Sequence, residues 1–291
     1  MIAEKFKYLE PKTMEEAVSL LSRHKEAAKV IAGGTDLIIQ LKKGAELPRY
    51  IINIKGIPNQ DSITYDEREG LRIGALATIH SIEVSPVIRQ KFGVLAQAAS
   101  ELGTSQVRNC ATIGGNLCNA APSAETAPAL IVLEARLKIA GTGGERTVPI
   151  EDFFTGPGQT VLHPDEIISE IQVPNPLPRS SGVYIKQTVR KALDLATVGV
   201  AVITRLDGDI IRDVKIALGA VAPTPIRARK AETIIREQKL DDALLDEAGL
   251  VASGEASPID DVRSSADYRR KIIRVLVGRA IRQAAEQIKA E

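Results

Sequence analysis

The 291-residue chain is poor in the side chains that hold metals, with two cysteines and three histidines. An all-cysteine iron–sulfur cluster needs four thiolates, so this chain alone cannot hold one. His24, His80 and His163 are far apart and match no zinc spacing, so we expect surface or loop positions and no metal site. Cys110 and Cys118 are interpreted as small apolar side chains beside a tight loop, because a reducing compartment disfavours a disulfide.

The chain has no excess of either charge. Its 38 Lys and Arg residues oppose 37 acidic residues, and a formal charge of +1 excludes a global field that would favour nucleic acid or an anionic membrane. The sequence also lacks an apolar run long enough for a membrane span, and its first residues do not resemble a signal peptide. With 44% hydrophobic and 26% charged residues it has an ordinary globular composition, and we expect a cytoplasmic protein.

Two common nucleotide motifs, the P-loop and a GxGxxG between a strand and a helix, do not occur. The sequence instead contains two glycine pairs, in residues 31–37 (IAGGTDL) and 111–117 (ATIGGNL), each after short apolar residues and beside a threonine. Paired glycines let backbone N–H groups approach a ligand, and successive N–H groups form a nest for an anion. One such pair is usually a plain turn. Two facing pairs predict a grip on the diphosphate of a dinucleotide, which we expect to be FAD.

Residues 1–56 predict a small α/β subdomain. Thr13 and Glu16 form a capping box that opens a helix, whose apolar stripe comprises Met14, Ala17, Val18 and Leu21. A second helix is expected over residues 36–41, ending at Gly44, and strands are expected over residues 5–9, 28–32 and 50–54. The first glycine pair therefore follows the carboxyl end of a strand, where open α/β sheets bind ligands.

Residues 57–174 predict a second subdomain. A hairpin is expected across residues 62–65 and 70–74, with further strands over 136–140, 147–149 and 167–173 and a turn at residues 141–144. Helices are expected from Thr78 and over residues 94–102 and 124–133. The second glycine pair is expected in a loop at residues 112–116, leading through small residues into the last of these helices.

Residues 175–291 predict a C-terminal domain behind a proline-rich linker at 174–182. Strand-like runs at 182–189, 196–206 and 210–218 come first, and Asp207 with Gly208 predicts a hairpin between the last two. Helices follow, and one face of the last comprises Tyr268, Ile272, Leu276, Ala280 and Ala284. The whole is an α+β chain: two α/β subdomains, then an antiparallel sheet with helices.

Further candidates for cofactor contacts each have a plainer alternative. Glu125 suits hydrogen bonds from ribityl hydroxyls, and it equally suits a helix start, where acids satisfy free N–H groups. Lys186 and Tyr184 alternate on one strand, where Lys186 would neutralise a reduced flavin or contact a phosphate and Tyr184 would cover an isoalloxazine ring. Their alternative is an exposed cation and an ordinary strand aromatic. Asn116 offers an amide to a phosphate oxygen or to its own loop.

These motifs together resemble one protein family. The strings IAGGTDL (31–37), TIGGN (112–116), GVYIKQ (182–187) and DLA (194–196) occur in the order and spacing of the FAD-binding medium subunit of molybdenum hydroxylases, such as carbon monoxide dehydrogenase and xanthine dehydrogenase. The resemblance covers essentially the whole chain. It implies a PCMH-like fold in which two α/β subdomains clasp FAD between the glycine loops, and a C-terminal domain that closes over it.

The resemblance also implies which residues bind the cofactor. The glycine segments would hold the diphosphate, and Glu125 would contact the ribityl region, where xanthine dehydrogenase has an aspartate. The implied cofactor-binding residues are Ala32, Gly33, Gly34, Thr35, Asp36, Thr112, Gly114, Gly115, Asn116, Glu125, Leu162, Tyr184 and Lys186. The cysteine-rich insertion of relatives resembling 4-hydroxybenzoyl-CoA reductase is missing.

The function implied by the resemblance is electron transfer. A large partner subunit would hydroxylate the substrate at a molybdenum cofactor, a small partner subunit would pass electrons through [2Fe–2S] clusters, and the flavin would deliver them to a terminal acceptor. No side chain of this chain is expected to act as a catalytic nucleophile or base. The alternatives are a free-standing FAD-dependent oxidoreductase with its own small-molecule substrate and an interaction protein that has lost its flavin.

Overall fold

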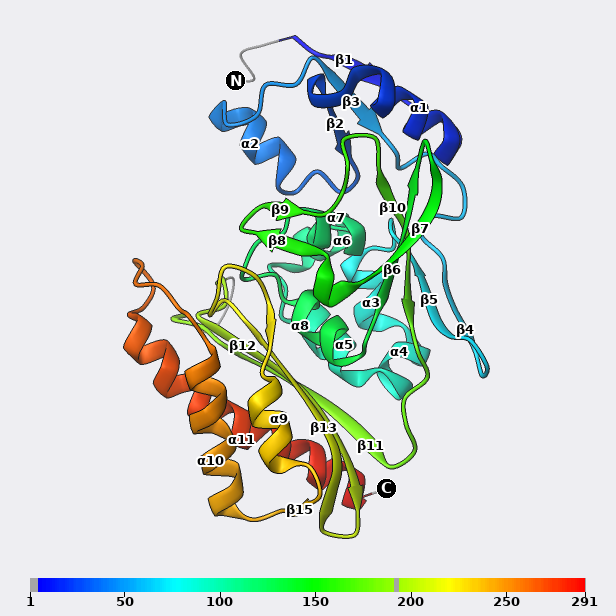
Figure 1. Ribbon diagram of the computed structural model, residues 1–291. Coiled ribbons are helices and arrows are strands. Elements are labelled where there is room, and N and C mark those ends of the chain that lie inside the picture. Colours follow the sequence, from blue (N-terminus) through cyan, green and yellow to red (C-terminus); the bar gives the residue numbers. More distant parts are fainter. Residues whose placement is uncertain (1–4, 191–193, 291) are drawn as a thin grey trace.

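The computed structural model describes residues 5–190 and 194–290. Three sheets of three or more strands follow one another along the chain. Figure 1 shows the first of them at one end of the molecule, the second in the middle and the third at the other end. Each sheet falls within one of the ranges 1–56, 57–174 and 175–291, and the division of the chain at these positions remains our proposal. We refer to the three ranges as the N-terminal, central and C-terminal units.

The N-terminal unit is built on a parallel sheet in the order β1–β3–β2. The predicted cap of α1 is confirmed, because the Thr13 hydroxyl accepts a hydrogen bond from the Glu16 N–H at 3.2 Å. The Glu16 carboxylate reaches back to the N–H of Lys12 at 2.7 Å rather than to that of Thr13. Helix α2 ends at Gly44, which has a left-handed φ of 69°. The elements are β1 (Lys7–Leu9), α1 (Met14–His24), the 3-10 helix η1 (Lys25–Ala27), β2 (Ala28–Ile31), α2 (Leu37–Lys43) and β3 (Tyr50–Asn53).

The central unit has an antiparallel sheet in the order β4–β5–β10–β6–β7, with helices packed against it. The predicted hairpin turn at Gly141–Gly144 is confirmed by the pairing of β6 with β7. The strands are β4 (Ile63–Asp66), β5 (Gly70–Gly74), β6 (Arg136–Gly141), β7 (Gly144–Pro149) and β10 (Ile167–Val173), with a separate pair β8 (Phe154–Gly156) and β9 (Gln159–Thr160). The helices are α3 (Ile79–Val84), α4 (Pro86–Lys91), α5 (Gly93–Ser100), α6 (Ser105–Cys110), α7 (Ile113–Cys118), α8 (Thr126–Val132) and the 3-10 helix η2 (Ile150–Asp152).

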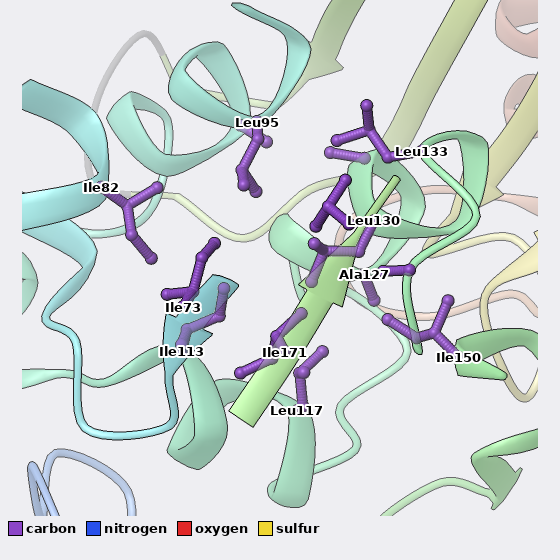
Figure 2. Close-up of a cluster of buried hydrophobic side chains, with 14 of the residues drawn as sticks. Ile73, Ile82, Leu95, Ile113, Leu117, Ala127, Leu130, Leu133, Ile150 and Ile171 are labelled. Carbon is purple, nitrogen blue, oxygen red and sulfur yellow. The ribbon is translucent and has the colours of Figure 1, made fainter. Parts of the chain in front are cut away.

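The second glycine pair lies in a helix, so the expected loop at residues 112–116 is wrong. Thr112 caps helix α7, which contains both glycines. Ile113 and Leu117 are fully buried, and Figure 2 shows them in one cluster with Leu130 of α8 and Ile171 of β10. Burying each of these side chains contributes about 1.5–3 kcal/mol, which offsets the low helix propensity of glycine.

The C-terminal unit is an antiparallel sheet covered on one face by helices (Figure 1). The hairpin predicted at Asp207 and Gly208 is confirmed, but the linker is shorter than expected because β11 begins at Ser180. The elements are β11 (Ser180–Gln187), β12 (Val198–Asp207), β13 (Ile210–Gly219), β14 (Ile226–Arg227), α9 (Arg229–Ile235), β15 (Gln238–Lys239), α10 (Asp242–Glu255) and α11 (Ala266–Ala290).

The buried stripe of α11 differs in part from the expected one. Leu276, Ala280 and Ala284 are buried as predicted, whereas Tyr268 is 45% exposed. Arg269, Ile273, Val277, Ile281 and Ala285 are also buried, whereas the predicted Ile272 is only partly buried. Although α11 is 25 residues long, charged residues interrupt it throughout. Within the described ranges, no helix combines the length and the apolar character that a bilayer crossing requires.

The C-terminal sheet lies between two layers, and its strands alternate accordingly. Val200 and Val202 of β12 belong to the cluster that includes the C-terminal helices. Ala201, between them, belongs to the cluster of the central unit, with α5 and α8. Ion pairs join the same two units, because Arg227 lies 3.0 Å from Glu151 and Lys215 lies 2.6 Å from Glu134. The central and C-terminal units therefore share one hydrophobic core and are joined by ion pairs at their interface.

Candidate cofactor-binding site

The first glycine segment, residues 32–36, connects the carboxyl end of β2 to the start of α2. Gly34 has a φ of +73°, which a residue with a Cβ adopts only under strain. Among the hydrogen bonds of the described ranges, none has a donor N–H from residues 33–36. Burial raises the pKa of Asp36, and a hydrogen bond to Thr35 opposes this shift. The segment therefore presents free backbone donors beside a carboxyl group whose pKa is raised.

In the second glycine segment, residues 112–116, the N–H groups of residues 113–116 donate within the protein. The N–H groups of Ile113 and Gly114 donate to Ala77 and Ala75, and that of Gly115 donates to the Thr112 hydroxyl at 3.1 Å. A Cβ on Gly114 would lie 2.8 Å from the Ala75 oxygen. This glycine pair therefore serves close packing, and the N–H nest expected there is not formed.

The first glycine segment meets the backbone directly before the second one. A Cβ on Gly33 would lie 2.2 Å from the carbonyl oxygen of Cys110 and 2.9 Å from the Cα of Ala111. Only glycine at position 33 allows this approach, because real Cβ atoms do not come so close to backbone atoms. The N-terminal and central units thus touch at the predicted junction.

A cavity of about 650 Å³ lies between these segments and is open to solvent. This is within the range of small-molecule and cofactor sites. All but two of the residues predicted to bind the cofactor line it: Ala32, Gly33, Gly34, Thr35, Asp36, Thr112, Gly114, Gly115, Asn116, Glu125 and Leu162. Their contacts with a cofactor remain predictions. Tyr184 and Lys186 are absent from the described lining.

Lys186 lies behind Glu125 as seen from the cavity. Its ammonium is 2.9 Å from the Glu125 carboxylate and 2.7 Å from the Glu101 carbonyl oxygen, and its side chain is 3% exposed. Burial raises the pKa of Glu125, and the Lys186 charge opposes this shift. Lys186 is therefore not the exposed cation of the plainer alternative, and it acts on the cavity through Glu125.

Tyr184 is buried on the same strand. Its N–H donates to the Gln97 side chain at 2.8 Å, and its hydroxyl would be 2.9 Å from a Cβ on Gly199. Burial raises the pKa of this phenol well above its ordinary value. Tyr184 of β11 thus lies against Gly199 of β12 and Gln97 of α5. A direct contact with a flavin ring remains a prediction.

The wall between α7 and α8 carries polar groups. The Asn116 side-chain oxygen accepts a hydrogen bond from the Thr126 hydroxyl at 2.5 Å, an arrangement that directs its amide nitrogen to other acceptors. Cys118 is exposed at the cavity, and desolvation of its thiol by neighbouring protein groups raises its pKa to about 12. Cys110 is exposed. Both cysteines thus lie beside the second glycine pair as interpreted, but they are exposed rather than packed in a core.

The sequence reasoning missed a turn at residues 163–166, which carries His163 and Glu166 to the cavity. Two Arg146 nitrogens each lie 2.7 Å from the Glu166 carboxylate, which also accepts the His163 N–H at 2.8 Å. The Arg146 hydrogen bonds lower the pKa of Glu166. Asp194 and Leu195 line the cavity from the C-terminal unit. The one sequence signal for this turn was its position directly after Leu162.

Two family models match the chain. The model described as "FAD binding domain in molybdopterin dehydrogenase" covers residues 4–176, more than half of the chain. The chain belongs to this family. A model described as "CO dehydrogenase flavoprotein C-terminal domain" covers residues 183–284. The first match ends between β10 and β11, and the second begins within β11, the first strand of the C-terminal sheet.

Relatives of this flavoprotein family are similar over nearly their whole length. The chain is 33% identical to the xanthine dehydrogenase FAD-binding subunit of Escherichia coli O157:H7, covering 94% of this chain and 93% of that protein. It is also 33% identical to the carbon monoxide dehydrogenase medium chain of Hydrogenophaga pseudoflava, covering 98% of each. A structure of carbon monoxide dehydrogenase from that organism superposes with a TM-score of 0.95 at 34% identity, covering 99% of each chain.

FAD is thus the cofactor of this chain, a flavoprotein subunit of the molybdenum hydroxylase family of oxidoreductases. The predicted fold, a two-subdomain FAD-binding fold followed by a sheet-and-helix domain, is confirmed. The residues present suit this cofactor, because free N–H groups of residues 33–36 provide donors for phosphate oxygens. The wall at Asn116 and Glu125 adds an amide donor and a carboxylate acceptor for hydroxyl groups.

Proposed function

We propose that this chain is the electron-transfer subunit of a molybdenum-containing hydroxylase or dehydrogenase. Its electrons would come from [2Fe–2S] clusters of a small partner subunit and would leave to a terminal acceptor. A large partner subunit would carry the molybdenum cofactor and bind the substrate. The observation that carries this proposal is the cavity between the two glycine segments in a chain of the FAD-binding family. We further propose that the complex is cytoplasmic.

The residues of the chain hold and orient the cofactor. The N–H groups of residues 33–36 would bind the diphosphate, with the Asn116 amide as a further donor. Glu125 would accept hydrogen bonds from the ribityl chain, with Lys186 fixing its orientation from behind. When bound, FAD supplies one- and two-electron redox chemistry, so that electrons collected singly can be delivered singly or in pairs. We assign no catalytic nucleophile or base to this chain.

Reduction of the bound flavin tests the proposal. The chain is expected to take up FAD in stoichiometric amounts and to show a flavin absorbance band. The isolated flavoprotein should keep its colour when offered the organic substrate of the complex, whereas the co-purified complex should bleach rapidly. Mass spectrometry of the co-purified proteins should identify an iron–sulfur and a molybdenum subunit.

Two outcomes contradict the proposal. Substrate-driven bleaching of the isolated chain would instead support a free-standing FAD-dependent oxidoreductase. A chain that takes up no FAD would support an interaction protein without a flavin.

A further inference from the structure

Arg269 of α11 is a buried charged side chain. It is 3% exposed and lies outside the described lining of the cavity. A buried guanidinium persists only where hydrogen-bond acceptors surround it. Its Nη1 donates to the carbonyl oxygens of Thr197 at 2.9 Å and Ala220 at 2.7 Å, and its Nη2 donates to the Asp261 carboxylate at 2.8 Å.

The carbonyl partners of Arg269 belong to segments that reach the cavity from two sides. Thr197 follows Asp194 and Leu195, which line the cavity. Ala220 donates its own N–H to the carbonyl oxygen of Pro122 at 2.7 Å, and Pro122 lies in the wall segment 121–125 that ends at Glu125. The Arg269 guanidinium is therefore bonded directly to segment 194–197 and, through Ala220, to segment 121–125.

The backbone at Ala220 has an unusual conformation beside this bond. Ala220 has a φ of +64°, a conformation that costs a non-glycine residue free energy and that persists where neighbouring contacts enforce it. The neighbouring contacts are the Pro122 oxygen on its N–H and the Arg269 nitrogen on its carbonyl. Loss of the guanidinium would release one of them and let the connection to segment 121–125 relax.

The third partner places the loop before α11 in the same network. One oxygen of Asp261 accepts the Arg269 Nη2 together with the N–H groups of Arg263 and Ser264. This carboxylate thus holds the turn 261–264 and neutralises the buried guanidinium. The loop itself does not line the cavity within the described ranges.

We propose that Arg269 is a positioning residue for the flavin: it holds segments 121–125 and 194–197 at a fixed separation and so sets the affinity and the environment of the bound cofactor. The inference rests on the proposed function, in which FAD occupies this cavity. Arg269 acts through backbone carbonyl groups and does not touch FAD. Its role as a positioning residue is therefore distinguished from a structural role by properties of the bound flavin, measured separately from stability.

The test compares Arg269→Gln with Arg270→Gln in the full-length chain. Arg270 is the next residue of the helix, 45% exposed and 3.5 Å from Asp267, and serves as the matched control. We expect Arg269→Gln to weaken FAD binding about tenfold, the equivalent of one charge-assisted hydrogen bond. It should also change the visible circular dichroism of the bound flavin, well below the melting temperature of the variant. Arg269→Lys, which keeps the charge, should recover part of both effects, and Arg270→Gln should match the wild type.

Hydrogen exchange on the wild-type chain provides a second measurement that does not depend on a variant folding. FAD is expected to slow exchange at residues 259–264, outside the cavity, because the network connects them to the wall. A melting temperature that falls in Arg269→Gln while FAD affinity and flavin dichroism stay at the wild-type values would reduce Arg269 to a structural role. Unchanged exchange at residues 259–264 would also overturn the inference. If the wild-type chain binds no FAD, the proposed function itself fails. This result is distinct from failure of the Arg269 inference, in which the wild-type chain still binds FAD.

Discussion

The ammonium of Lys186 and the carboxylate of Glu125 lie 2.9 Å apart, with their side chains 3% and 6% exposed. The residues are on different units, Lys186 on β11 and Glu125 directly before α8. Only Glu125 reaches the described lining of the cavity. A buried pair of this kind contributes little as a pair, but losing one partner leaves the other charge uncompensated.

Replacing Lys186 alone by Met should therefore lower the stability of the protein more than replacing both residues of the pair. We expect Lys186→Met to lower the free energy of unfolding by about 3–5 kcal/mol, because the buried Glu125 carboxylate is left without its cation. The double variant Lys186→Met/Glu125→Gln should regain most of this loss. Urea unfolding of the chain without FAD measures both, and equal losses in the single and double variants would contradict the explanation. The flavin potential should also shift in Lys186→Met.

Glu166 should give the stability of the protein a defined pH dependence. Hydrogen bonds from Arg146 lower its pKa below the ordinary value of 4.5. A carboxyl group with a depressed folded pKa contributes stability that is present above 4.5 and is lost as pH falls through the folded pKa. Glu166→Gln should lose about 1–3 kcal/mol at neutral pH. The difference from the wild type should shrink as the pH is lowered below 4.5.

Unfolding curves across this pH range provide the measurement for Glu166. Glu145→Gln is the control, because the Glu145 side chain is 56% exposed and pairs with Lys138 at the surface. Such pairs contribute less than about 1 kcal/mol, so its curve should follow the wild type. A Glu166→Gln difference that stays constant with pH would rule out the assigned role.

A methyl group at position 33 should separate the two glycine segments. Gly33→Ala would bring its Cβ within 2.2 Å of the Cys110 oxygen, so the backbone of one unit must move. We expect a loss of about 1–3 kcal/mol in stability. FAD affinity should fall as well, since the cavity lies between the displaced segments. Gly254→Ala, in α10 with open space around the added Cβ, should be neutral or stabilising. Equal behaviour of the two alanine variants would refute the close approach.

The cap of α7 should matter for both folding and the cofactor. In Thr112→Val the Gly115 N–H loses its acceptor, which should cost about 1 kcal/mol of stability. Thr112→Ser retains the hydroxyl and should stay near the wild type. Thermal unfolding and FAD titration of the pair provide the comparison. A valine variant as stable as the serine variant would show that the cap contributes nothing.

Features with a local cause could be predicted from the sequence. The Thr13 cap, the end of α2 at Gly44 and the hairpin at Asp207 and Gly208 depend on residues within a few positions of one another. The glycine segments were recognised for the same reason. Helix α7 was missed because two glycines disfavour a helix locally, and tertiary burial of Ile113 and Leu117 outweighs that preference.

Pairings between distant segments could not be predicted. Glu125 and Lys186 are 61 positions apart, and no periodicity shows that β11 brings the lysine behind the glutamate. The same holds for Glu166 with Arg146 and for Arg269 with the carbonyl groups of Thr197 and Ala220. The sequence indicates which residue types are available, whereas the packing of β11 and α11 decides which of them meet.

The shared core of the central and C-terminal units limits how this protein can be recombined with its relatives. A chimera cut at the linker would place a foreign sheet against α5 and α8, where Ala201 and Ala217 now fill small spaces. It would also leave Glu151 without Arg227. The central and C-terminal units should therefore be transferred as one piece. Exchange of the parallel sheet before them must preserve its buried contacts with Leu76, Ala140 and Ile167 and a glycine where Gly33 meets Cys110.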